Sequence, residues 1–117
     1  MSDDLFNTIY NKSLDLLSRR EHSFKEIKEK LSARFENKKI IESVIEKLSD
    51  NNLVNNTRYA EAYVSARKRK GFGPKKIAFE LSSKGVDESV TNSVIIEEGD
   101  WESAAKLAFS KKFKDGP

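Results

Sequence analysis

The densest group of chemically active side chains in this sequence is a basic run, RKRKGFGPKK, at residues 67–76. The run holds six basic and no acidic side chains, whereas residues 1–50 hold ten of each. A local positive field of this density suits an acidic protein surface or a phosphate backbone. The alternative is a solvated helix end, because Lys and Arg also favour the last helical turn for dipole reasons. We interpret the run as a binding surface.

Catalytic and metal chemistry find little support in the residue types. The chain has no cysteine, and its one histidine, His22, precedes Ser23 in a predicted turn, where a lone histidine is usually a solvated loop residue. The carboxylates are scattered among basic neighbours, so no pair is set apart for acid–base work. Gly71-Phe72-Gly73 lacks the preceding strand and the third glycine of a dinucleotide loop. We therefore expect a protein that is not an enzyme and that uses no cofactor and no metal.

Helical spacing of apolar residues runs along the whole chain and predicts helices without strands. A capping box of Ser23 and Glu26 marks one helix start, and Pro74 after Gly73 marks another. Asn56 or Thr57, Asp87 and Asp100 are the other expected N-caps, and Gly71, Gly85 and Gly99 are the expected stops. Seven helices follow, beginning near residues 4, 24, 38, 57, 74, 88 and 101.

The expected inward faces place some basic residues near the core and others in solvent. In the helix that ends near residue 70, Tyr59, Ala62, Tyr63 and Ala66 share one face. That face puts Arg67 beside the core and turns Lys68 and Arg69 outward. Trp101 is also expected to face inward. Phe72, between two glycines, either plugs a gap between helices or stands exposed for a partner.

The sequence repeats itself at a spacing of 50 residues. Ser23, Ile27 and Leu31 correspond to Gly73, Ile77 and Leu81, and the pair Arg19-Arg20 corresponds to Arg69-Lys70. A period of this length indicates one small helical unit used more than once. The segment from Trp101 resembles the one from Tyr59, so a third unit begins there. The expected repeats are residues 1–54, residues 55–99, and an incomplete third at 100–117 that ends in a tail.

Composition agrees with a single small helical protein. Charged residues make up 35% of the 117 residues and hydrophobic ones 37%. No apolar run approaches the roughly 20 residues of a membrane span, and the N-terminus lacks the basic start of a signal peptide. We expect a soluble, cytoplasmic monomer.

Two segments resemble the RecX family of bacterial recombination regulators. The first is LVNNTRYAEAYVSARKRKGFGPKKIAFELSSKGV, at residues 53–86, and the second is LLSRREHSFKEIKEKL, at residues 16–31. The resemblance implies an all-α fold of tandem three-helix repeats in a curved, elongated array. It also implies binding to the RecA recombinase and its filament on single-stranded DNA, with inhibition of ATPase and strand exchange. By this resemblance the partner-binding residues, for RecA or DNA beside it, would be Arg19, Arg20, Arg67, Lys68, Arg69, Lys70, Phe72, Lys75, Lys76, Lys111 and Lys112.

Two other readings of the basic run stay open. One alternative is a direct single-stranded DNA-binding module that uses residues 67–76. The other is an inert helical scaffold. Phosphate contacts would make DNA binding strongly dependent on salt. A scaffold would bind no partner through these residues.

Overall fold

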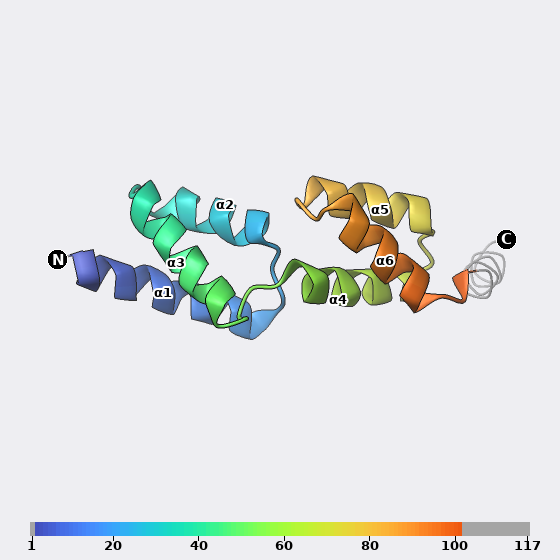
Figure 1. Ribbon diagram of the computed structural model, residues 1–117, viewed down its shortest axis with the longest axis horizontal. Helices are drawn as coiled ribbons and strands as arrows, with labels where there is room; N and C mark the ends of the chain where they lie inside the picture. The colour runs from blue at the N-terminus through green and yellow to red at the C-terminus, as the bar shows by residue number, and fades with distance from the viewer. Residues whose placement is uncertain (1, 102–117) are drawn as a thin grey trace, which may run out of the picture. The chain divides into compact units, whose positions relative to one another are not determined.

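The computed structural model describes residues 2–101, which form six α-helices and no strand (Figure 1). The expected all-α fold is thereby confirmed. Of the expected seventh helix only Trp101 lies within the described residues. The helices are α1 (Ser2–Arg19), α2 (Phe24–Arg34), α3 (Lys38–Asp50), α4 (Asn56–Arg69), α5 (Pro74–Ser83) and α6 (Glu88–Glu98).

The described part of the chain divides into two compact units, and the division falls between Tyr59 and Ala60. The first turn of α4 therefore belongs with the first unit and the rest of the helix with the second. Helix α5 begins 50 residues after α2, at 74 and 24, and α6 begins 50 residues after α3, at 88 and 38. The sequence repeat is thus a structural repeat of three helices. The repeat boundaries after residues 54 and 99 stay a prediction.

The first unit packs α1 against α2 and α3 around one apolar core. Helix α1 contributes Ile9, and the i, i+4 pair Ile27 and Leu31 of α2 is fully buried with it. Phe24 and Phe35 lie half-buried at the two ends of α2 and pack on this core. The buried members of the cluster are Ile9, Ile27, Leu31, Ile41, Val44, Leu48 and Val54.

In the second unit the inward face of α4 differs from the expected one. Tyr59 is buried as expected, but Ala60 and Val64 take the fully buried row, while Ala62 is exposed and Tyr63 is half-buried. Small side chains let the helix approach its neighbours closely, and a tyrosine at the edge keeps its hydroxyl within reach of a partner. Among the described residues of this unit, the other buried apolar ones are Ala60, Val64, Ile77, Leu81, Val86 and Val94.

Most helix ends lie where they were expected, although Asp87, at the N-cap position of α6, makes no side-chain cap hydrogen bond. Ser23 and Glu26 form the full capping box, and Gly73 with Pro74 begins α5. The start of α4 is a correction: neither Asn56 nor Thr57 caps it. Asn55 does, because its Oδ1 accepts the N–H of Arg58 at 2.9 Å. The Asn56 side chain is thereby left for another role.

Candidate functional site

Arg67, in the last turn of α4, is held by a carboxylate of α5. Its Nε donates to Glu80 Oε1 at 3.0 Å, and its terminal nitrogen donates to Glu80 Oε2 at 2.8 Å. The Tyr63 hydroxyl donates to the same Oε1 at 3.0 Å. The hydrogen bonds from Arg67 and then Tyr63 lower the pKa of Glu80, and the bond to Glu80 raises the pKa of Arg67. A fork-on-fork pair of this kind orients the guanidinium and uses two of its five N–H donors.

Phe72 fills the space beside this ion pair. Its ring centroid lies 3.8 Å from the Arg67 guanidinium carbon and 4.9 Å from Lys76 Nζ. The backbone reaches this position through Gly71, whose φ of 94° suits glycine alone. Of the two alternatives for Phe72, the half-buried ring therefore fits the one in which it fills a gap between helices, in contact with cations of α4 and α5.

Lys68 is a correction to the expected outward face. Its side chain is only 15% exposed, and Nζ lies 3.7 Å from Glu98 Oε1. Nζ also donates to the Gly99 carbonyl at 2.6 Å and lies 5.5 Å from the Trp101 ring centroid. Lys68 continues the buried row of Ala60 and Val64, so it lies at the border of the core. Its positive charge lies at the C-terminal end of α6, where the helix dipole makes a cation favourable.

Four basic side chains of the run remain exposed: Arg69 and Lys70 at the end of α4, and Lys75 and Lys76 in the first turn of α5. Within residues 2–101, the side chains of Arg69, Lys70 and Lys75 make no hydrogen bond or ion pair, whereas Lys76 lies over the Phe72 ring and its charge also acts on the Glu80 carboxylate. The first turn of α5 has no acidic residue to balance the two lysines. Positive charge at a helix N-terminus is unfavourable to the helix dipole, so the two lysines do not stabilise the start of α5. We call these four residues the basic edge; its chemistry suits a carboxylate-rich or phosphate-rich surface.

The corresponding pair in the first unit is neutralised locally. Arg20 donates to both carboxylate oxygens of Glu26, at 3.1 and 3.3 Å, and this bond raises the pKa of Arg20. Arg19 is exposed but pairs with Asp15 at 3.2 Å. Lys111 and Lys112 lie outside the described residues.

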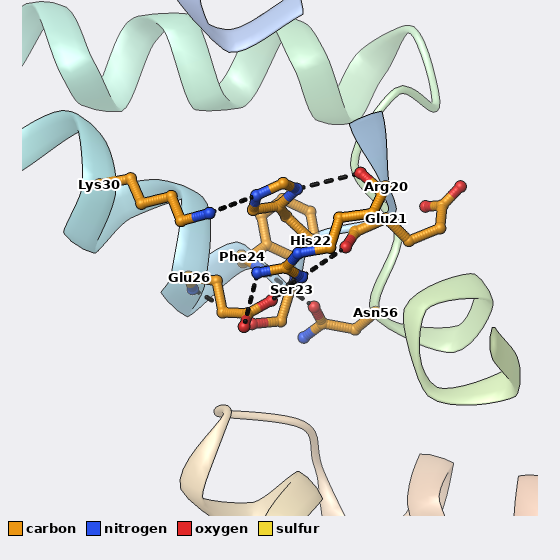
Figure 2. A network of polar contacts seen from close by, with 8 residues as sticks. All are labelled: Arg20, Glu21, His22, Ser23, Phe24, Glu26, Lys30 and Asn56. Carbon is orange, nitrogen blue, oxygen red and sulfur yellow. Dashed lines mark hydrogen bonds and ion pairs between the residues drawn. The ribbon is translucent and has the colours of Figure 1, made fainter. Parts of the chain in front are cut away.

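His22 is a second correction, because it is 1% exposed and not a solvated loop residue. Figure 2 shows its ring between the Arg20 backbone and Lys30. Nδ1 lies 3.0 Å from the Arg20 carbonyl oxygen, and Nε2 lies 2.8 Å from Lys30 Nζ. A carbonyl only accepts and an ammonium only donates, so Nδ1 carries the proton of a neutral ring. Burial lowers the pKa of His22, and the charges of Arg20 and Lys30 act in the same direction.

The capping box was the available signal for this burial. A capping box is often accompanied by packing of the residue before the cap against the fourth helical residue, and here those two positions hold His22 and the buried Ile27. No sequence signal predicted the contact of Lys30 with His22, because that contact depends on the conformation of the turn before α2.

The turn at His22 also holds the start of α4 in place. Asn56 Oδ1 accepts the Phe24 N–H at 2.9 Å, as Figure 2 shows, and Arg58 Nε donates to Glu21 Oε1 at 2.7 Å. Arg58 donates further to the Asn52 and Leu53 carbonyls. The polar residues of the turn therefore explain why the first turn of α4 belongs with the first unit.

Within residues 2–101 no group of three or more His, Cys, Asp or Glu side chains could hold a metal ion. None of the helices described there combines the length and the apolar character that crossing a bilayer requires.

Comparisons with known proteins agree on one family. The family models of the first and second three-helix domains of RecX match residues 10–48 and 55–95. A regulatory protein RecX of Pseudomonas fluorescens is 33% identical over 111 residues, which cover 94% of this chain and 72% of the relative. One of Vibrio parahaemolyticus is 39% identical over 103 residues, covering 87% and 66%.

Solved structures show the same likeness. The crystal structure of RecX from Lactobacillus salivarius superposes with a TM-score of 0.80 at 29% identity, over 100% of this chain and 79% of that one. Both described units thus have a counterpart in sequence and in fold, and the chain belongs to the RecX family of regulatory proteins.

Proposed function

We propose that this chain is a non-enzymatic, cytoplasmic negative regulator of recombination. It binds the RecA recombinase, chiefly its filament on single-stranded DNA, and inhibits RecA ATPase and strand exchange. Membership of both three-helix units in the RecX family carries the proposal. The basic edge supports it, because its four exposed cations, three of them without a carboxylate partner in residues 2–101, are available to an acidic protein surface.

Among the residues expected from the sequence, we propose Arg69, Lys70, Lys75 and Lys76 as the main partner contacts. Arg67, Lys68 and Phe72 act through the geometry of the α4–α5 turn, since their polar and ring contacts lie within the unit. Arg19 is exposed but shares its charge with Asp15. Lys111 and Lys112 stay proposed contacts on sequence grounds.

The direct test measures RecA's DNA-dependent ATPase and strand exchange with this protein in excess. We expect both activities to fall. Unchanged activities in the presence of folded protein would sink the proposed function.

The basic edge is tested by the triple reversal Arg69→Glu, Lys70→Glu and Lys75→Glu. Like charges facing an acidic partner repel, so filament affinity should fall by more than about tenfold. The matched control reverses Lys28, Lys38 and Lys39, three exposed lysines of the first unit without partners in residues 2–101. It makes the same formal change from positive to negative and should leave affinity near wild type. Equal losses in both variants would show that only net charge matters.

A second candidate, direct binding to single-stranded DNA, rests on the same exposed cations. Each phosphate contact on a single strand makes the slope of log K against log salt concentration more negative by about 0.7. Four such contacts therefore predict a slope of roughly −3. Filament binding that tolerates salt, beside weak binding to bare DNA, would assign the basic edge to protein.

A further inference from the structure

Among its described residues, the second unit exposes two large apolar side chains, Phe79 of α5 and Ile96 of α6, each 77% exposed. Single exposed apolar residues are ordinary on protein surfaces, so exposure alone implies nothing. Their positions in the repeat are informative. At the same places 50 residues earlier, the first unit has Glu29 and Glu46, both exposed.

Charged residues of the first unit are replaced by uncharged ones at further positions along the same two helices. Lys28 and Glu42 of the first unit correspond to Ala78 and Asn92 of the second. The first unit forms the same two helices with charged residues at these places. The three-helix fold therefore does not require an apolar surface here, and the second unit has one for another reason.

A groove of about 260 Å³ lies between α5 and α6 along this surface. Phe79, Ala78 and Val86 supply its apolar wall, and Glu88 is the one charged residue among the described residues that line it. The volume is below the roughly 300–1,000 Å³ of small-molecule pockets, but it can take one large side chain. Thr91 also lines it, and its buried Oγ1 has no hydrogen-bond partner among the described residues.

We propose that this groove receives an amphipathic helix of a protein partner, which places one large apolar side chain against Phe79 and a basic side chain at Glu88. The groove between two packed helices accommodates the ridge of a third, and a helix buries its apolar face in such grooves. Glu88 is exposed and makes no hydrogen bond or ion pair within residues 2–101, so it is available to a cation and repels phosphate. Asn92 and Ile96 continue its i, i+4 row along α6.

This inference rests on the proposed function for the partner's identity, which is RecA. It adds a contact of opposite character to the basic edge. The basic edge attracts acidic groups, whereas the groove selects an apolar side chain flanked by a positive charge.

The repeat supplies the test variants, because the first unit shows that its own residues fit the fold. Phe79→Glu, Ile96→Glu and Glu88→Lys each place the first-unit residue at the same position of the second unit. We expect Phe79→Glu to weaken binding to RecA filaments on single-stranded DNA by on the order of tenfold or more, since a buried aromatic contact is lost. Ile96→Glu and Glu88→Lys should weaken it by several-fold. Phe79→Leu, which keeps an apolar group, should stay within about threefold of wild type.

The outcomes separate the two proposals. Wild-type binding with no loss in Phe79→Glu or Glu88→Lys overturns the groove and leaves the proposed function standing. Absence of wild-type binding overturns the proposed function itself. Glu29→Phe, which adds an exposed ring to the first unit, should not strengthen binding; an equal effect there would show nonspecific adhesion. A wild-type dimer that Phe79→Glu dissociates, with filament affinity unchanged, would make the groove a self-interface and overturn the proposal. Circular dichroism confirms that each variant is folded.

Discussion

At the residue scale, each ring nitrogen of His22 has a fixed role in the neutral state. The Nδ1 hydrogen is bonded to the Arg20 carbonyl, and the Nε2 lone pair accepts from Lys30. A second proton would sit on Nε2 and replace that hydrogen bond with two positive charges 2.8 Å apart. Protonation therefore turns a stabilising contact into a repulsive one, inside a turn that also holds Asn56.

We predict that the free energy of unfolding falls as the pH is lowered below about 6.5, the ordinary value for histidine. In that window the unfolded chain binds a proton at His22, whereas the folded chain resists it because burial lowers the pKa of His22. More protons on the unfolded state make the free energy of unfolding rise with pH, so the contribution is complete above this value. Denaturant titrations at about pH 7.5 and about pH 5.5 measure the difference.

The matched control is His22→Gln, which has no proton to gain in this range. It should be less stable near neutral pH and should lose most of the pH dependence between the two conditions. Lys30→Met removes the facing ammonium and should reduce the dependence in part. The same pH slope in wild type and His22→Gln would assign the effect to other groups.

At the element scale, the N-cap residues of α2 and α5 share one backbone geometry, but only the first has a side chain that can cap its helix. Ser23 has φ −74° and ψ 162°, and Gly73 at the corresponding place has φ −83° and ψ 168°. A Cβ built on Gly73 meets no atom within 4 Å. A serine therefore fits this cap without strain and can accept the Lys76 N–H, as Ser23 accepts that of Glu26.

We predict that Gly73→Ser raises the free energy of unfolding by about 0.5–1 kcal/mol, through the cap and the reduced freedom of the unfolded chain. The contrasting variant is Gly71→Ser, two residues earlier at φ 94°. It should lower stability by about 1–2 kcal/mol, because a side chain is strained in the left-handed region. Thermal or denaturant unfolding of both variants checks the pair; equal effects would contradict it.

The starts of α2 and α5 were predictable because their signals are local, whereas the cap of α4 was misplaced by one or two residues. Ser23 with Glu26, and Gly73 with Pro74, define helix starts from a few neighbouring residues. The inward face of α4 was not, because two rows compete and the choice depends on partners elsewhere. Tyr63 lies at the edge since Glu80, 17 residues on, accepts its hydroxyl.

At the scale of the whole molecule, one fold occurs twice with different surfaces. The sequence located the basic run, but its division into internal and exposed cations depends on carboxylates of other helices. Glu80 and Glu98 bind Arg67 and Lys68 and leave the basic edge exposed. The groove was missed because an apolar residue on a helix is first expected in the core, and helical spacing alone does not show that Phe79 is exposed.

The two units also differ in how apolar their cores are. Ile41 and Leu48 are fully buried in the first unit, while the corresponding residues of the second are Thr91 and Glu98. Thr91 is 3% exposed, and its Oγ1 finds no hydrogen-bond partner within residues 2–101. An unpaired buried hydroxyl costs about 1–3 kcal/mol, so the second unit is expected to open more readily than the first.

Thr91→Val replaces that hydroxyl by a methyl group of the same shape, and we predict that it stabilises the second unit by about 1–2 kcal/mol. Native-state hydrogen exchange reads the effect by element: amides of α5 and α6 should exchange more slowly, and those of α2 and α3 at the wild-type rate. The control is Thr8→Val on α1, where the hydroxyl is exposed and donates to the Asp4 carbonyl. It should change stability by less than about 0.5 kcal/mol. If Thr91→Val destabilised α5 and α6, the hydroxyl would have a partner that the structure does not show, such as an internal water, and the difference between the two cores would need another cause.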